Sequence, residues 1–277
     1  MLSDREFRIL LDHFDRPWSG YRKVRKGVKK RLRRHMNRLG CTTVETYLRT
    51  LRKHPEQEAI ANQCLLVTIS RFFRDRNLWR FMRNSLLPHI GSYFDHPVRF
   101  WSAGCACGEE PYSVAVLWAS LFGRSAATVL ATDARTSCLE RAAEGVYSSG
   151  SLKEMPEDMR TTYFTPRRGG RQWRIRKDTL PPIRWQRRDL FDAPADGPFH
   201  MIFLRNNLLT YHRGARLRSG LAGIVSALVP GGWLVVGSHE RLPSSFSNLM
   251  RIRSCPWVYR LTEKAAGLDR SVPYPVC

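Results

Sequence analysis

The chain has 277 residues, 43% of them apolar and 25% charged, which is enough to bury a core in one large domain or two smaller ones. No apolar run approaches the roughly 20 residues that cross a bilayer, and the first residues carry charges of both signs where a signal peptide has an apolar core. These features argue against a secreted or membrane-inserted protein, so we expect a cytoplasmic one. The net charge of +22 predicts an acidic partner surface, nucleic acid or anionic lipid, without choosing among them.

About the first 80 residues are predicted to be helical. Phe7, Leu10, Leu11 and Phe14 recur at helical spacing between residues 6 and 14. Three further helices are expected, at Tyr21–Leu39, Thr43–Leu51 and 56–69. The sequence therefore predicts a helical N-terminal domain, with bounds at residues 1–78.

Strands and helices alternate in the remainder, residues 79–277. The predicted strands are Val98–Ser102, Thr128–Asp133, Phe199–Leu204 and Trp233–Gly237. The predicted helices between them are Pro111–Leu121, Thr136–Glu144 and Leu217–Val229. This alternation is typical of an α/β protein with a doubly wound, mostly parallel sheet.

Residues 147–183 interrupt the alternation. They contain Pro, Gly and many Arg, with short β-like pieces such as Gln172–Arg176. We expect a small β-subdomain inserted into the second domain, beginning after about Tyr147.

Seven cysteines are scattered along the chain, and none forms a CxxC pair, so the sequence predicts no metal site. Cys105 and Cys107 lie in a run of small residues after the first predicted strand. The favoured interpretation is that they fill a tight turn, with a redox or metal role as the alternative.

The segment Trp101–Ser113 joins the first predicted strand to its helix. Small residues at 103–108 would let a ligand approach the backbone, and two acids, Glu109 and Glu110, follow at once. Carboxylates would repel a pyrophosphate but attract an ammonium or sulfonium group. S-adenosylmethionine carries both cations. The alternative is that the two acids only complement the helix N-terminus.

An acid also ends the second predicted strand, at Asp133. A carboxylate in this position can accept hydrogen bonds from both ribose hydroxyls of a nucleoside. It could instead cap the next helix. With the small-residue loop before it, Asp133 completes a pattern typical of a nucleoside site.

Several blocks together resemble the CheR family of chemotaxis receptor methyltransferases, which act on glutamate. Ile69–Asp75 resembles the family signature Thr-x-Phe-Phe-Arg-Asp/Glu, and Trp101–Ser113 resembles its Gly-Glu-Glu-Pro-Tyr-Ser loop. Phe203–Tyr211 resembles Phe-Cys-Arg-Asn-Val-x-Ile-Tyr. Further matching blocks are Ala131–Asp133 with Ala142–Tyr147, Leu228–Gly237 and Val258–Tyr259. The resemblance spans nearly the whole chain and implies a Rossmann-like domain that binds S-adenosylmethionine.

The resemblance also implies residue roles, with S-adenosyl-L-homocysteine as product and no metal. Glu110 would bind the methionine ammonium and Asp133 the ribose, while Asp189 and Leu190 stand where the family has Asn-Leu at the adenine. The remaining cofactor residues would be Thr68, Ser70, Arg74, Arg205 and Asn206. Arg74 and Tyr211 would lie beside the transferred methyl group as catalytic residues.

Some positions depart from the family pattern. Asp189 replaces Asn, Ser70 replaces Thr, and Thr68 stands where Asn is common. Residues 237–240 read Gly-Ser-His-Glu where the family has Gly-His-Ser-Glu. We expect these changes to alter affinity and not the identity of the cofactor. The chemistry needs no general base, because a sulfonium methyl is already activated and a glutamate carboxylate is an anion near pH 7.

Ten Lys and Arg residues and no acid lie between Arg22 and Arg38. The segment matches the basic N-terminal helix of the CheR family, which implies docking on acidic receptor helices. The periodicity of a helix puts four of the cations on one face, Lys26, Lys30, Arg33 and Arg34. The alternatives are a solvated helix face and a nucleic-acid surface.

The leading functional hypothesis is methylation of glutamates on the cytoplasmic helices of a methyl-accepting chemoreceptor, by a monomer that does not insert into the membrane. A non-catalytic regulator that binds S-adenosylmethionine is the first alternative, because the departures fall around the cofactor site. A nucleic-acid methyltransferase is the second, on charge alone, since the Asp/Asn-Pro-Pro-Tyr/Phe motif of amino-group methylases is missing from the sequence.

Overall fold

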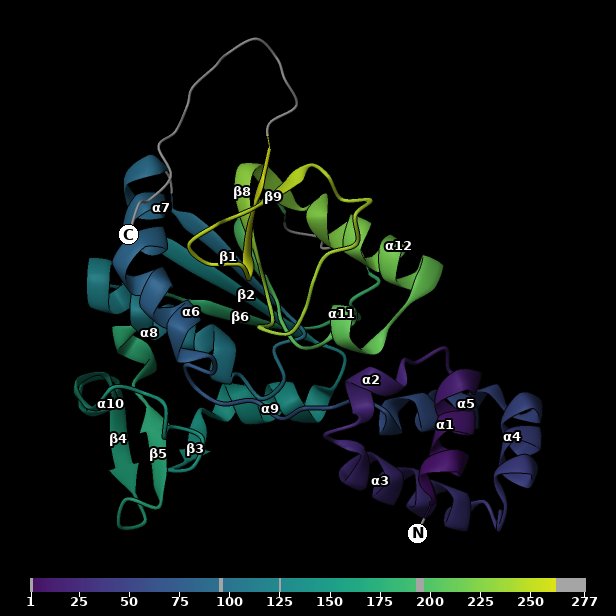
Figure 1. The fold of residues 1–277 in the computed structure, drawn as a ribbon. Helices are drawn as coiled ribbons and strands as arrows, with labels where there is room; N and C mark the ends of the chain where they lie inside the picture. Colours follow the sequence, from purple (N-terminus) through teal and green to yellow (C-terminus); the bar gives the residue numbers. More distant parts are fainter. Residues whose placement is uncertain (1, 95–96, 125, 193–196, 263–277) are drawn as a thin grey trace. The chain divides into compact units, whose positions relative to one another are not determined.

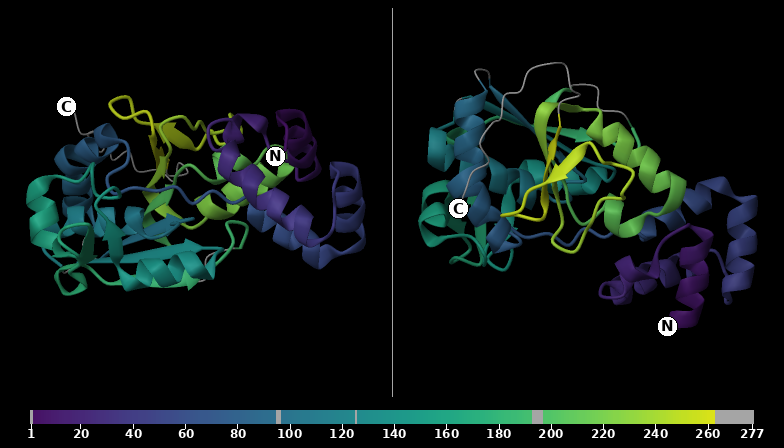
Figure 2. Two further views of the ribbon diagram at one scale, coloured as in Figure 1. Left: turned by 90° about the horizontal axis from the view of Figure 1, so that it is seen from below. Right: turned by 45° about the horizontal axis from the view of Figure 1, so that its top comes forward.

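The computed structural model describes residues 2–94, 97–124, 126–192 and 197–262 (Figures 1 and 2). The chain forms two compact units, one of Met1–Thr68 with Asn207–Arg218 and one of Ile69–Asn206 with Ser219–Cys277. The sequence placed the boundary at residue 78, whereas residues 69–78 belong to the second unit and a segment near residue 210 belongs to the first. Among the described residues, no helix is both long and apolar enough to span a membrane.

The first unit is helical. Its helices are α1 (Asp4–His13), α2 (Trp18–Tyr21), α3 (Arg25–Arg38), α4 (Val44–Lys53), α5 (Pro55–Cys64) and α11 (Leu208–Tyr211). Helix α1 begins with a capping box, in which Ser3 Oγ accepts from the Glu6 amide and the Glu6 carboxylate accepts from the Ser3 amide. The core of this unit is formed by apolar residues at helical spacing, among them Phe7, Leu10, Leu32, Met36, Tyr47 and Leu51.

Two helices in this unit differ from the predicted ones by several residues. The segment predicted as one helix from Tyr21 forms the end of α2 and a turn before α3 begins at Arg25. Helix α5 begins at Pro55, whose missing amide hydrogen is tolerated in a first turn, and ends at Cys64, five residues before the predicted end.

The second unit contains a mixed seven-stranded sheet in the order β6-β2-β1-β7-β8-β10-β9. The strands are β1 (Val98–Ala103), β2 (Ala127–Asp133), β6 (Ile183–Arg187), β7 (Phe199–Leu204), β8 (Leu228–Val236), β9 (Leu249–Arg251) and β10 (Val258–Leu261). Strand β1 pairs in parallel with both neighbours, so that Phe100 lies opposite Val129 on β2 and Met201 on β7. Strand β10 runs antiparallel to both of its neighbours, β8 and β9. The predicted α/β fold class is confirmed.

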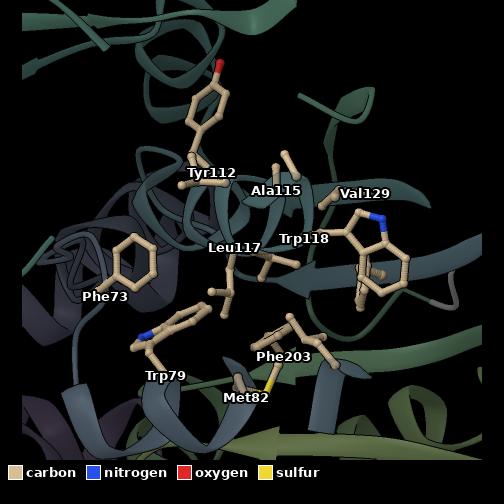
Figure 3. Close-up of a cluster of buried hydrophobic side chains, with 14 of the residues drawn as sticks. Phe73, Trp79, Met82, Tyr112, Ala115, Leu117, Trp118, Val129 and Phe203 are labelled. Atoms are coloured by element: carbon tan, nitrogen blue, oxygen red, sulfur yellow. The ribbon is translucent and has the colours of Figure 1, made fainter. Parts of the chain in front are cut away.

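Helices α6 (Arg76–Phe81), η1 (Met82–Leu86), α7 (Leu87–Tyr93) and α8 (Glu109–Phe122) gather on one side of this sheet (Figure 1). Their buried side chains interdigitate with those of the strands (Figure 3). The Trp79 ring stacks on Phe203 of β7 at 6.0 Å and meets Phe73 edge-on at 5.3 Å. This packing fixes the segment before α6 against the sheet. Helix α9 (Thr136–Glu144) contacts β2 and β6.

The predicted insert is an antiparallel sheet in the order β3-β5-β4, separate from the main sheet. It comprises β3 (Val146–Ser148), β4 (Phe164–Arg167) and β5 (Gln172–Ile175), with α10 (Glu157–Tyr163) and the 3-10 turn η2 (Lys177–Thr179). Phe72 anchors it, since its ring meets Tyr147 at 4.8 Å and Phe164 at 5.3 Å.

Some elements escaped prediction. Strand β6 reads Ile-Arg-Trp-Gln-Arg, which is too polar to be recognised as a strand from the sequence. Its charged side chains are compatible with a strand because β6 lies at the edge of the sheet. Helices α6 to α7 and strands β9 and β10 were also missed. The last predicted helix ends early: α12 spans Gly214–Val225, and β8 already begins at Leu228.

Candidate active site

The carboxyl ends of the parallel strands β1, β2 and β7 meet at one edge of the sheet, where ligands of open α/β sheets bind. Polar residues gather there: Ser102 is the second-last residue of β1, Asp133 ends β2, Arg205 directly follows β7, and Glu110 lies in the first turn of α8. Eight of the ten predicted site residues belong to this unit, namely Ser70, Arg74, Glu110, Asp133, Asp189, Leu190, Arg205 and Asn206.

An ion-pair network around buried Arg205 forms the centre of this edge. Arg205 Nη1 donates to Glu110 Oε2 at 2.9 Å, and its Nη2 donates to Asp75 Oδ2 at 2.7 Å. Ser102 Oγ donates to the second Glu110 oxygen at 2.7 Å. Two carboxylates thus share one guanidinium, and the network carries one negative charge in excess. A cationic ligand group would neutralise that excess.

Arg74 lies on a tightly held segment beside the network. The residues on both sides of it, Phe73 (φ 52°) and Asp75 (φ 70°), have left-handed backbone conformations, which are uncommon for residues other than glycine. Such conformations cost about 1–3 kcal/mol each and persist where the surroundings impose them. The Phe73 amide donates to Ser113 Oγ at 3.0 Å, and the Arg74 carbonyl accepts from Trp79 Nε1 at 2.8 Å and from Arg205 Nη2 at 2.9 Å. The half-exposed Arg74 side chain donates to the Ile69 carbonyl.

Asp133 is 9% exposed, and both of its oxygens are used by the backbone. Oδ2 accepts from the Ala106 amide at 2.9 Å and Oδ1 from the Arg135 amide at 3.0 Å. The first bond ties the small-residue loop to the end of β2. Burial raises the pKa of Asp133, and the two backbone bonds oppose that change. The N-cap of α9 is Arg135, so the capping role considered for Asp133 is not the one it has.

Asp189 and Leu190 follow β6, which lies beside β2 in the sheet. The Arg188 amide donates to the Asp133 carbonyl at 3.0 Å, which brings the two strand ends together. Asp189 is exposed and contributes to the raised pKa of Asp133, as a nearby like charge does. The predicted ribose and adenine residues are therefore neighbours.

Asn206 and Glu240 connect the ends of β7 and β8. Buried Glu240 Oε2 accepts from the Asn206 amide at 2.8 Å and from the Gly237 amide at 2.7 Å. A Cβ atom on Gly237 would lie 2.7 Å from that oxygen and 2.8 Å from Asn206 Oδ1, so only glycine fits. Asn206 has φ 55°. Glu240 and Asp75 were not predicted as site residues, although Asp75 ends a block that carried the family resemblance and Glu240 ends the segment 237–240 that departs from it.

The two adjacent acids of the first loop differ in environment. Glu110 pairs with Arg205, whereas Glu109, the first residue of α8, is 6% exposed and its Oε2 has no hydrogen-bond partner among the described residues. Burial raises the pKa of Glu109, and a hydrogen bond from Ser70 partly opposes this. Ser70 thus contacts a buried acid at the helix start.

Thr68 and Tyr211 belong to the helical unit. The Tyr211 ring lies 4.9 Å from the ring of buried Tyr21, and its carbonyl accepts from Arg16. In the family signature the tyrosine is the fifth residue after the arginine. Counted from Arg205, the fifth residue is Thr210, and Tyr211 is the sixth.

The basic helix α3 is less uniformly charged at its surface than its sequence suggests. Arg25 and Lys29 both bind Asp4 of α1, and Arg31 donates to the carbonyls of Cys64 and Leu66. These cations serve the fold of the unit.

Three of the four predicted docking residues are exposed, Lys26, Lys30 and Arg34. The fourth, Arg33, is half-buried and donates to the Thr42 carbonyl at 3.1 Å. The exposed three lie at four-residue intervals and share a face of α3.

The described residues fit S-adenosylmethionine. The strand edge offers carboxylates at Glu110, Asp133 and Asp189, and the Arg205 network has a negative charge in excess. Acceptors of this kind suit the ammonium, the ribose hydroxyls and the amino group of adenine. The basic residue at the centre of this edge, Arg205, is already paired with two carboxylates, so the edge is less suited to a pyrophosphate.

Known proteins resemble this chain over most of its length. A family model described as the SAM-binding domain of CheR methyltransferase matches residues 68–259. A chemotaxis protein methyltransferase of Listeria monocytogenes is 30% identical over 194 residues, covering 69% of this chain and 73% of that protein. That of Klebsiella aerogenes is 30% identical over 236 residues, covering 82% and 78%. Among solved structures, the N-methyltransferase NodS of Bradyrhizobium japonicum with S-adenosyl-l-homocysteine is 15% identical with a TM-score of 0.41, covering 70% of this chain and 89% of that one.

Proposed function

The chain belongs to the CheR methyltransferase family, and we propose that it methylates glutamate side chains on the cytoplasmic helices of a methyl-accepting chemoreceptor. S-adenosyl-L-methionine is the methyl donor in this proposal and S-adenosyl-L-homocysteine the product. The protein would work in the cytoplasm as a monomer, without inserting into the membrane.

The observation that carries the proposal is the Arg205 network beside Asp133. Arg205 is held between Glu110 and Asp75, which leaves one negative charge in excess for the ammonium of the donor. Asp133 would hold the ribose, with Asp189 and Leu190 at the adenine. The remaining cofactor contacts would come from Thr68, Ser70, Arg74 and Asn206.

When bound, S-adenosylmethionine supplies an activated methyl group. The protein then needs to place an incoming carboxylate in line with that group and to keep water out. Arg74 is suited to orient the carboxylate, because its backbone is fixed by Trp79 and Arg205 while its side chain is half-exposed. Tyr211 remains the second proposed catalytic residue, although its ring packs on Tyr21.

Helix α3 would recognise the acidic receptor helices through Lys26, Lys30, Arg33 and Arg34. Exposed cations of this kind steer association and set orientation more than they add affinity. The net charge of +22 supports an acidic partner.

The test is incubation of the protein with labelled S-adenosylmethionine and membranes that contain chemoreceptors. The proposal predicts base-labile label on a receptor-sized band, because methyl esters hydrolyse in base. Glu110→Gln should abolish most of the label, whereas Glu140→Gln, the same change on the exposed face of α9, should not. Binding of the donor without transfer to any receptor would favour a cofactor-binding regulator. Base-stable label on nucleic acid would favour a nucleic-acid methyltransferase.

A further inference from the structure

A cavity lies in the sheet unit, next to the segment that carries Arg74. Its volume is about 440 Å³, and it is bounded by α6, η1, α8 and the residues around the start of α10. None of the ten predicted site residues lines it. The methyl-transfer chemistry proposed above therefore leaves it unexplained.

Its walls are apolar and its rim is cationic. Phe73, Trp79 and Leu117 come from the main core, where Figure 3 shows them side by side, and Met155 and Met159 face them from the insert. Methionine side chains adapt their shape to a ligand more easily than branched ones do. Arg76, Arg80 and Arg83 stand at the rim at near-helical spacing.

The three arginines are exposed, and within the described residues none has a carboxylate within 4.0 Å. The one acid at the rim, Glu154, is paired with Arg71 at 3.6 Å. Like charges one helical turn apart repel each other and destabilise a helix unless an anion is bound. The row is therefore suited to an anionic ligand.

The backbone at this rim is unusual. Arg83 and the neighbouring rim residue Asn84 lie in η1, a π-helical turn, and such turns occur frequently at functional sites. The wider turn also changes the direction of Arg83 relative to an unbroken α-helix. Trp79 connects this cavity to the other site, since its ring lines the cavity and its Nε1 donates to the Arg74 carbonyl.

The chemistry of the lining favours a small phosphorylated ligand over a peptide. All three cations are arginines, whose guanidinium groups bind phosphate oxygens in pairs. None of the lining residues belongs to a strand, so a peptide cannot add to a sheet edge here. The volume lies in the range of small-molecule sites. Trp79 and Met155 both line the cavity, so a flat apolar group of the ligand would contact them there.

We propose that this cavity binds a nucleotide, with its phosphates on Arg76, Arg80 and Arg83 and its base between the aromatic and methionine walls. The proposal does not depend on the proposed function, because it uses no residue of the methyl-transfer site.

Isothermal titration calorimetry tests it on the full chain, in magnesium-free buffer with saturating S-adenosylhomocysteine so that nucleotides are kept from the cofactor site. The ligands are ATP, GTP, sodium pyrophosphate and an acidic tryptophan-containing peptide. At least one nucleotide should bind about tenfold or more tightly than pyrophosphate, because only the nucleotide fills the apolar walls. The double variant Arg80→Gln/Arg83→Gln should weaken nucleotide binding by about tenfold or more.

The matched control is Arg167→Gln/Arg168→Gln, which removes the same charge from exposed residues at the β4–β5 turn, outside the cavity. It should leave nucleotide affinity unchanged. Three results would overturn the proposal: no nucleotide binding at millimolar concentration, equal losses in the two double variants, or Arg80-dependent binding of the peptide alone.

Discussion

Arg205 donates to Glu110 at 2.9 Å with a guanidinium side chain that is only 3% exposed. The pair joins the residue after β7 to the first turn of α8, the helix that follows the neighbouring strand β1. Because Asp75 occupies the other side of the same guanidinium, Glu110 is oriented without being fully neutralised. Removing one partner of such a pair leaves an uncompensated charge in a largely buried place, which destabilises the fold. The stability of the protein is therefore sensitive to single substitutions at Glu110 or Arg205.

Glu110→Gln should weaken binding of S-adenosylhomocysteine by about tenfold or more, because it removes the excess negative charge that would meet the ligand ammonium. Glu109→Gln is the matched control one residue away, and it should bind as the wild type does. Calorimetry on both folded variants measures this. Equal losses in the two variants would remove the special role of Glu110.

Asp133→Ala should weaken cofactor binding by about tenfold or more, because each charge-assisted bond to a ribose hydroxyl contributes about 1.5–3 kcal/mol. The substitution also frees the Ala106 amide that Asp133 holds. Asp133→Asn therefore provides a second variant that keeps an acceptor for that amide. Unchanged affinity in both folded variants would contradict the assignment.

Glu109 gives a pH dependence of stability with a definite sign. Its pKa is raised by burial, so the folded state holds the proton to a higher pH than the unfolded chain does. The protonated Glu109 side chain is therefore tolerated in the fold at low pH. As the pH rises from the pKa that Glu has in the unfolded chain, about 4.3, through its pKa in the folded state, the free energy of unfolding of the wild type decreases. Denaturation midpoints should show that the stability of Glu109→Gln relative to the wild type increases as the pH rises from about 4 to 7. A gain that is constant or shrinks over that range would refute the sign.

Arg74→Ala should slow methyl transfer by more than it weakens donor binding, because the residue is proposed to orient the acceptor carboxylate. Single-turnover rates at saturating donor separate the two effects. Tyr211→Phe tests the second catalytic assignment. Thr210→Val tests the preceding residue, which stands at the position of the tyrosine in the family signature. A slowed Thr210→Val with a normal Tyr211→Phe would transfer the role to Thr210. Normal rates in Arg74→Ala would remove it from the catalytic residues.

Reversing two docking cations, Lys30→Glu with Arg34→Glu, should raise the receptor KM by about tenfold and reduce its salt dependence, while donor affinity stays unchanged. The control is Arg49→Glu with Arg52→Glu, the same change on exposed residues of α4. A wild type that prefers polynucleotide to receptor at physiological salt would contradict the docking assignment.

Much of this structure was predictable because the informative signals were local. Strands β1, β2 and β7 are largely buried, and two of them lead directly to residues that the sequence already singles out, because Asp133 ends β2 and Arg205 follows β7. The pairing of Glu110 with Arg205 was not predictable, because 95 residues separate them and only the strand order brings them together. The pairing of Asp75 with the same guanidinium was not predictable for the same reason, since the fold alone brings Asp75 and Arg205 together. Glu109 and Glu110 differ in their burial and in their partners, and the sequence of two adjacent identical residues does not show such a difference.

Strand β6 at the edge of the sheet and the basic helix α3 were predicted less well from the sequence, because their structure depends on neighbouring segments. Polar β6 is stabilised by its neighbour β2 and not by its own alternation. The charge of α3 was overestimated as a free surface, because Asp4, which binds Arg25 and Lys29, lies outside the segment that was counted.

Tandem mass spectrometry of a chemoreceptor cytoplasmic fragment after incubation with the protein and S-adenosylmethionine tests the central claim most directly. The account predicts the added mass of one methyl group on defined glutamate side chains, removed by mild base and absent with the Glu110→Gln protein. Methylation of another residue type, or none on a receptor fragment under conditions where the donor binds, would contradict it.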